Sequence, residues 1–126
     1  MRISTKTFAA SVLALVLGVA VAATVNVTWV NPVANTDGSA MVPADIKQTR
    51  IEYGTCSAPG VFGTKAGDVI VNGVASAGSI TNLTPGTWCA RAYTMNIYNV
   101  ESDPSNVASK VVAAPKPNAP TNFSLN

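Results

Sequence analysis

The residues that could carry out chemistry are few in this chain of 126 residues. The sequence contains no histidine to act as a general base, and its six carboxylates are scattered among predicted turns and strand faces. General acid–base catalysis needs such groups close together around a substrate, and a serine nucleophile of the hydrolase type needs a G-x-S-x-G motif, which the sequence lacks. We therefore predict that the protein is not an enzyme and uses no cofactor.

Asp37, in "NTDGS", has a second interpretation, as a calcium ligand or a catalytic acid. Asn-x-Asp-Gly is, however, first of all a turn sequence, because Asn and Asp bond to their own backbone and Gly accepts a positive φ. The cysteines do not form a C-x-x-C motif either, so no metal site is predicted.

The N-terminal segment has the composition of a secretory signal peptide. Arg2 and Lys6 precede an uncharged run over residues 8–25, and Ala20-Val21-Ala22 supplies a small-x-small cleavage pattern. We predict a signal peptide over residues 1–22 and a secreted, periplasmic or extracellular protein. The alternative is an uncleaved anchor, since the run is close to the ~18 residues that indicate a spanning helix. Only in that case would the protein have a membrane partner.

An exported protein with two cysteines is expected to oxidise them. Cys56 and Cys89 therefore predict one disulfide, and not a metal site or a nucleophile. The net charge of +2 includes Arg2 and Lys6, and without these two the basic and acidic residues are equal in number. A chain without net positive charge is not steered toward nucleic acid or anionic lipid, so neither is a predicted partner.

Short alternating runs dominate the chain beyond the N-terminal segment, and none has a long 3.6-residue period. "TVNVTWV" places Val25, Val27 and Trp29 on one face, and "TRIEYGTC" does the same for Ile51 and Tyr53. The runs "DVIVNGV", "GSITNL", "TWCARAYTM" and "NVASKVV" follow, separated by segments rich in Gly, Pro, Asn and Asp. This pattern predicts an all-β sandwich of antiparallel strands.

Four segments resemble successive landmarks of a fibronectin type III module, in the variety found in small exported proteins of bacteria and their phages. They are "WVNPVANTDGS", "RIEYGTCS", "NLTPGTWCARAYT" and "ESDPSNVAS". The resemblance runs from about residue 24 to residue 114, so one such domain is predicted over residues 23–114. It implies an immunoglobulin-like antiparallel β-sandwich with Trp29 in the core and Leu83 before the "PGT" corner. Two positions depart from the family's pattern: Thr49, where strand C often has a tyrosine, and "WC", which replaces the corner tyrosine.

The resemblance, combined with strand alternation, assigns side chains to the two faces of a sheet. If Trp88 takes the corner, Ala90 and Ala92 also point inward, as do Ile51 and Tyr53 from the neighbouring strand. Cys56 and Cys89 then lie on the outer face, where the two strands are antiparallel neighbours, and a cross-strand disulfide follows. The other outer residues predict a solvated ladder of cross-strand pairs, with a binding face as the alternative: Arg50, Glu52, Arg91 and Tyr93.

The segment "MNIYNVES" falls in the loop between the last two strands of the implied fold, near the long loop of residues 31–45. There it would expose Met95, Ile97, Tyr98 and Val100. Exposed aromatic and aliphatic side chains are candidate contacts for a glycan or a protein. The alternative is that Ile97 and Val100 pack onto the end of the core and Tyr98 covers it.

The end of the chain, "PKPNAPTNFSLN", looks like the beginning of a module of this family, whose strand A follows a proline-rich approach. The predicted signal peptide occupies the usual place of that strand. We interpret residues 115–126 as a proline-rich linker and a candidate donor strand, with Phe123 and Leu125 entering a neighbour's core. "PKPNA" spans only about 17 Å, too short for the segment to return into its own molecule. The alternatives are a free tail and a degenerate second module.

These features predict an exported structural or adhesive subunit that assembles head to tail by C-terminal strand addition, with further copies of itself as partners. The alternative is a monomeric binding module for a surface glycan or protein, which would use the loop of residues 95–100.

Overall fold

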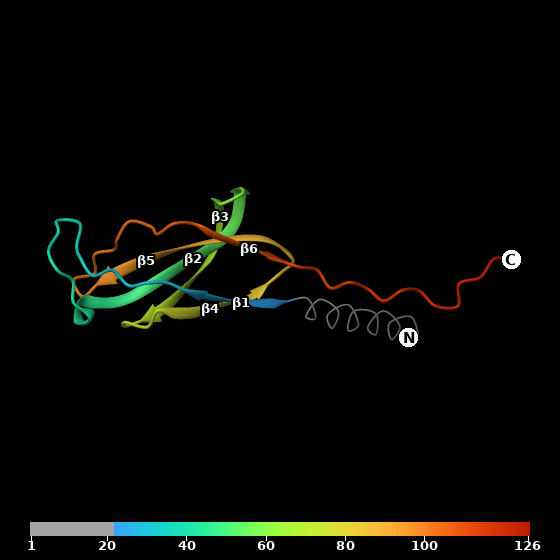
Figure 1. The fold of residues 1–126 in the computed structure, drawn as a ribbon, viewed down its shortest axis with the longest axis horizontal. Coiled ribbons are helices and arrows are strands. Elements are labelled where there is room, and N and C mark those ends of the chain that lie inside the picture. Colours follow the sequence, from blue (N-terminus) through green and yellow to red (C-terminus); the bar gives the residue numbers. More distant parts are fainter. Residues whose placement is uncertain (1–21) are drawn as a thin grey trace, which may run out of the picture.

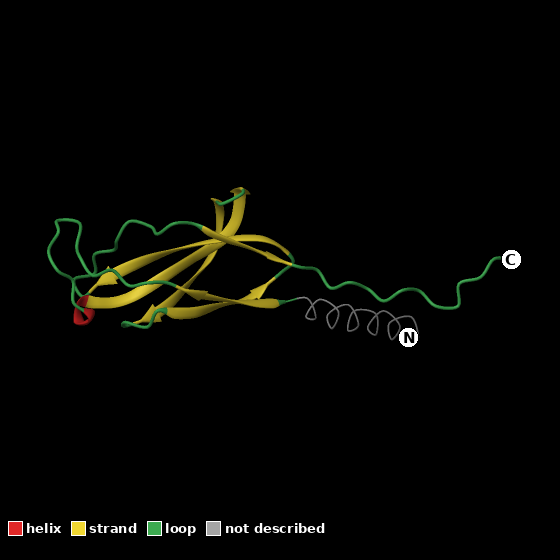
Figure 2. Ribbon diagram, in the orientation of Figure 1, coloured by secondary structure: helices red, strands yellow, loops and turns green. Residues whose placement is uncertain are grey.

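The computed structural model describes residues 22–126, which form two antiparallel β-sheets packed face to face (Figures 1 and 2). The smaller sheet pairs β1 (Ala23–Thr28) with β4 (Ala77–Leu83). The larger sheet has the order β3-β2-β5-β6, from β2 (Ile46–Ala58), β3 (Val61–Asn72), β5 (Gly86–Asn96) and β6 (Ala108–Val112). One short 3-10 helix, η1 (Pro43–Asp45), precedes β2. The prediction of an all-β sandwich is confirmed.

The predicted signal peptide lies outside the described residues except for Ala22. Within residues 22–126, no helix has the length and apolar character needed to cross a bilayer.

The core between the sheets is small. Ile51, Ile80, Leu83 and Val112 are buried, and a ring of partly buried residues packs against them. Strand alternation turns every second residue toward the opposite sheet, and the predicted inward positions are confirmed on both β2 and β5. The partly buried ring contains Ala23, Val25, Val27, Trp29, Tyr53, Val69, Trp88, Ala90 and Ala92. These side chains stay partly exposed because a sheet of two strands faces a sheet of four.

The two tryptophans stabilise opposite ends of the sandwich. Trp88 occupies the corner between β4 and β5, where its indole N–H donates a hydrogen bond to the carbonyl of Thr84 at 2.8 Å. Trp29 lies just beyond β1, half-buried against the core, and its indole N–H donates to Oδ1 of Asn31 at 3.0 Å. Each ring is therefore apolar on its faces and satisfied at its one donor, which is the usual arrangement for a buried tryptophan.

The hairpin of β2 and β3 is bulged near its tip. The register shifts between Tyr53 and Cys56, and the backbone approaches so closely there that a Cβ on Gly54 would clash with the carbonyl oxygen of Thr64. Figure 2 shows the tip turned out of the line of the two strands. The tip covers Cys89, whose exposed fraction is 0%, and the Cys56–Cys89 disulfide ties it to β5. The pairing of the cysteines was predicted, but the burial of Cys89 under the hairpin was not.

Reduction of this disulfide should destabilise the fold. The bond closes a separation of 33 residues, for which chain-entropy arguments give about 3 to 4 kcal/mol. Denaturant unfolding with and without reductant measures the loss. A double variant, Cys56→Ala with Cys89→Ala, is the control and should not respond to reductant. Equal unfolding midpoints for the oxidised and reduced wild type would contradict the prediction.

Thr49 points inward from β2 and is completely buried, and its hydroxyl has no hydrogen-bond partner within the described structure. Replacing such a group with an apolar one of the same shape removes a desolvation penalty. We expect Thr49→Val to raise the free energy of unfolding by about 1 kcal/mol. Thr87→Val, on an exposed face of β5, is the matched control and should change little. Destabilisation by Thr49→Val would mean that the hydroxyl is satisfied in solution.

Candidate functional site

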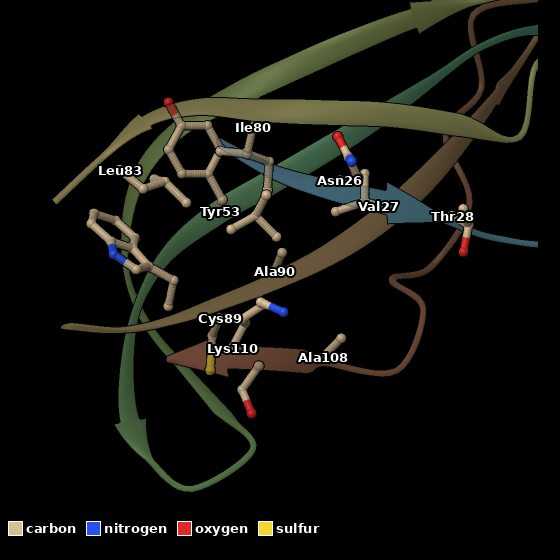
Figure 3. Close-up of a pocket in the computed structure, with 13 residues that line it drawn as sticks. Asn26, Val27, Thr28, Tyr53, Ile80, Leu83, Cys89, Ala90, Ala108 and Lys110 are labelled. Atoms are coloured by element: carbon tan, nitrogen blue, oxygen red, sulfur yellow. The ribbon is translucent and has the colours of Figure 1, made fainter. Parts of the chain in front are cut away.

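One side of the sandwich is open along its length. In the described chain, β1 pairs only with β4, and β6 pairs only with β5. The remaining edges of β1 and β6 border the same cavity, because residues of both strands line it. Figure 3 shows this cavity between the two strands, with Tyr53 and Ile80 pointing into it. We call the opening the β1–β6 groove.

Two connected cavities make up the groove. The first has a volume of about 230 Å³ and lies beside Leu83 and Trp88. The second, of about 370 Å³, extends toward Trp29 and shares lining residues of β1, β5 and β6 with the first. The shared residues are Val27, Thr28, Ala90 and Ala108.

The lining of the groove is mainly apolar, and the groove is deep because a small residue lies among larger ones. Val25 and Val27 point inward from β1, and the rings of Tyr53 and Trp88 meet below them with their centroids 6.3 Å apart. The small side chain of Ala90 on β5 leaves a hollow between these larger groups. An unpaired strand edge above an apolar interior is a template for a further strand, which would supply both hydrogen bonds and side chains.

The C-terminal segment carries the apolar side chains that we predicted for such a strand. Residues 113–126 run away from the body of the molecule along its long axis (Figure 1). Phe123 is 84% exposed and Leu125 is 90% exposed, so neither packs in the groove of its own chain. The structure thus holds an open groove and a separate exposed segment, and their union stays a prediction.

The loop after β5 contains the other set of predicted binding residues. Met95 belongs to β5, and Ile97, Tyr98 and Val100 are 49%, 78% and 61% exposed. The backbone N–H groups of Tyr98 and Val100 both donate to Oδ1 of Asn96, which fixes the turn. Tyr98 therefore projects into solvent and does not cover the core, whereas Ile97 and Val100 are half-covered.

A cleft of about 350 Å³ with polar and apolar walls lies between this loop and the loop of residues 31–45. Asn35, Thr36, Asn96, Glu101 and Asp103 contribute polar groups to its walls. Asp37 lies outside the lining and accepts hydrogen bonds from the backbone N–H and hydroxyl of Ser39, as a turn residue does. Among residues 22–126, no cluster of His, Cys, Asp or Glu is arranged to hold a metal ion.

The outer face of the larger sheet carries a network of ion pairs. Arg50 donates two hydrogen bonds to the carboxylate of Glu101, at 2.8 and 2.9 Å, and a third to Asp68 at 3.0 Å. Its guanidinium also lies 4.2 Å from the ring centroid of Tyr93. The pairing fastens the loop after β5 to the middle of the sheet.

Glu52 is the centre of the same network and is only 9% exposed. Arg91 donates to Glu52 at 2.7 Å, and Phe62 from the hairpin tip covers the Arg91 guanidinium. We predicted a solvated ladder at these positions. The cross-strand pairs are present, but they are more enclosed than expected because the hairpin tip and the loop after β5 both fold over them.

Sequence reasoning identified the open edge and part of the lining of the groove, because it placed Tyr53 and Trp88 inward. The alternation of Val25 and Val27 indicated a strand with one apolar face, and the resemblance indicated that its neighbour was displaced. The contribution of Ala108, and the position of all these side chains around one groove, depend on which strands become neighbours in space, and no local signal in the sequence reveals that.

Comparison with known proteins does not assign the chain to a family. No protein-family model matches the sequence, and no curated protein or solved structure matches it either.

The Glu101–Arg50 pair makes stability depend on pH. Hydrogen bonds from Arg50 lower the pKa of Glu101, and burial opposes this only in part. Burial would raise the pKa of Glu52, but hydrogen bonds from Arg91 and Tyr93 outweigh it and the pKa is lowered. Because the folded pKa lies below the ordinary value of 4.5, the stabilisation is complete above that pH and is lost as the pH falls through the lowered value.

We expect the free energy of unfolding to fall between about pH 6 and pH 2, and to fall less in Glu101→Gln. Denaturant unfolding across this range measures both slopes. Asp103→Asn is the matched control, because the carboxylate of Asp103 forms no ion pair in the described structure. Identical slopes for Glu101→Gln and the wild type would show that the pair does not stabilise the folded state.

Proposed function

We propose that this chain is an exported structural or adhesive subunit with a fibronectin type III-like fold, and that it assembles by strand addition. In this proposal the C-terminal segment of one molecule fills the β1–β6 groove of another. One observation carries the proposal: an apolar groove beside the unpaired edge of β1 occurs in the same chain as an exposed segment with alternating apolar residues.

The spacing of the segment suits the groove. Phe123 and Leu125 are two residues apart, so in an extended strand they point to the same side. Ser124 lies between them and would point outward, as would Asn122. A strand of this pattern gains main-chain hydrogen bonds from the edge that it joins and places its alternate side chains in the pockets below.

Donation to a second molecule fits the geometry better than return to the same one. The last residue of β6, Val112, pairs with Gly86 close to the pole at which β1 begins. A return into the same groove would need an immediate reversal of the chain within a segment that contains Pro115 and Pro117. Proline fixes φ and stiffens a linker, which favours continued extension away from the body.

The disulfide and the N-terminal segment support export. The Cys56–Cys89 bond is formed within the fold, and structural disulfides persist in oxidising compartments outside the cytosol. The basic residues, apolar run and small residues at the start of the sequence support a cleaved signal peptide. The resemblance to modules of bacterial and phage proteins supports the same location.

A second candidate function is a monomeric module that binds a surface glycan or protein through the loop of residues 95–100. The exposure of Tyr98 and the cleft beside the loop, with its polar and apolar walls, favour it. Aromatic faces stack on sugars, and neighbouring amides and carboxylates bond to hydroxyl groups. A protein that stays monomeric at high concentration would support this candidate against the first.

Replacing both apolar residues of the tail tests the proposed assembly. We expect Phe123→Ser with Leu125→Ser to remove about 3 to 6 kcal/mol of apolar contact and to convert assemblies into monomers. Sedimentation or light scattering of the purified protein measures the mass. Asn122→Ser with Ser124→Ala, which changes the opposite side of the same strand, is the matched control and should still assemble. An unchanged mass for the Phe123/Leu125 variant would reject strand addition.

A further inference from the structure

We infer that the donated segment enters the groove from the end opposite to the one at which its own chain leaves, and runs antiparallel to β1. This inference rests on the proposed function and adds direction and register to it. The consequence is an open series of subunits joined head to tail, and not a closed pair that exchanges tails.

The strand directions define the two possibilities. Ala23 at the start of β1 pairs with Leu83, and Val112 at the end of β6 pairs with Gly86, so both lie at one pole, which we call the tail pole. The loop of residues 31–45 and the turn of residues 97–100 lie at the other, the loop pole (Figure 1). A segment that enters at the loop pole runs antiparallel to β1, and one that enters at the tail pole runs parallel to it.

Each direction implies a different assembly. Entry at the loop pole joins the tail pole of the donor to the loop pole of the acceptor, which is a heterologous contact and leaves a free groove and a free tail at the two ends. Entry at the tail pole brings two tail poles together, and the two chains can then exchange segments in a closed dimer.

The chemistry of the two cavities favours entry at the loop pole. In the antiparallel direction, Leu125 lies beside Val25 in the cavity lined by Leu83 and Trp88, which has the more apolar walls. In the same register Phe123 lies beside Val27.

The other end of the strand also fits in this direction. Thr121 lies beside Trp29, in the cavity that Ser105 and Asn106 also line. The walls of this cavity are more polar than those of the cavity beside Leu83 and Trp88, so a hydroxyl is better placed here.

The parallel direction exchanges these environments. Thr121 would enter the apolar cavity, where its hydroxyl meets the side chains of Leu83 and Trp88, while Leu125 would lie beside Ser105 and Asn106. A buried hydroxyl without a partner is destabilising. The parallel direction is therefore less favourable at both Thr121 and Leu125. Phe123 does not discriminate, because it lies over Ala90 and Ala108 in the middle of the groove in both directions.

The loop pole offers a second argument. Val30, Val33 and Tyr98 lie at or near this pole with exposed fractions of 93%, 79% and 78%. Entry at the loop pole brings the donor's body against these side chains, whereas exchange through the tail poles leaves them in water. The linker of residues 113–120 is long enough for the contact, since it spans about 25 Å at the ~3.1 Å per residue of a polyproline helix.

Antiparallel addition also completes the smaller sheet. It converts a pair of strands into a three-stranded sheet with an apolar face, and antiparallel pairing is slightly more stable per residue than parallel pairing. The register places Ser124 opposite Asn26 on the outward side, whereas the parallel direction places Ser124 near Thr28.

Paired cysteines distinguish the two directions. Full-length variants that carry Asn26→Cys with Ser124→Cys, or Thr28→Cys with Ser124→Cys, are oxidised mildly and analysed by mass under non-reducing conditions. Ser124→Cys alone is the control for random contact between tails. We expect a ladder of covalent multiples from the Asn26 pair only, and a cross-linked heterodimer when the Asn26→Cys and Ser124→Cys single variants are mixed.

Four results would overturn the inference. Cross-linked dimers from the Thr28 pair would establish exchange between tail poles. Cross-linking in neither pair, in a protein that still needs Phe123 and Leu125 to assemble, would reject the register and leave the proposed function intact. A cross-linked monomer from the Asn26 pair, or a wild-type protein that never assembles, would reject the proposed function as well.

Discussion

The unpaired edge of β1 is the constraint on which the rest of the structure depends. A sheet of two strands cannot cover the inner face of a sheet of four, so side chains that alternation turns inward remain partly in water. The free energy available from covering Val25, Val27, Tyr53 and Trp88 is therefore not fully realised by the chain alone. Whatever lies in the groove gains that free energy, together with the hydrogen bonds of an open strand edge.

Two restraints act on the outer face of the larger sheet and hold β2 and β5, the strands whose inner faces form the floor of the groove. The hairpin tip is tied to β5 by the disulfide, and the loop after β5 is fastened to β2 by the pair of Arg50 with Glu101. Both restraints act on the outer face of β2 and β5, whose inner faces carry Tyr53 and Ala90. A floor that is already ordered lowers the entropic cost of binding a strand. The disulfide and the ion pair on the outer face thus order the strands that form the floor of the groove.

Sequence reasoning reached the parts of this fold that follow from short-range alternation. It predicted the inward residues of β2 and β5, the pairing of the cysteines and a corner at Trp88, because each depends on parity along one strand. It missed the Arg50–Glu101 pair, since Glu101 lies on a loop far from Arg50 in the sequence and only the turn fixed by Asn96 brings the two together. The contribution of Ala108 to the groove was missed for the same reason. Thr49 was identified only as a departure from the tyrosine that is frequent at that position. The burial of its hydroxyl was not predicted, because burial depends on neighbours from other strands.

An unpaired edge above an apolar interior is also a hazard, because any extended chain can pair with it. The tail limits that hazard by its own composition. Pro115, Pro117 and Pro120 lack a backbone N–H and cannot sustain a ladder of hydrogen bonds, so only the last residues of the tail are able to pair. In the inferred register, those residues place Leu125 in the more apolar cavity and Thr121 in the less apolar one. Selectivity in the proposed assembly then comes from the match between each cavity and one side chain, while the edge itself supplies affinity without discrimination.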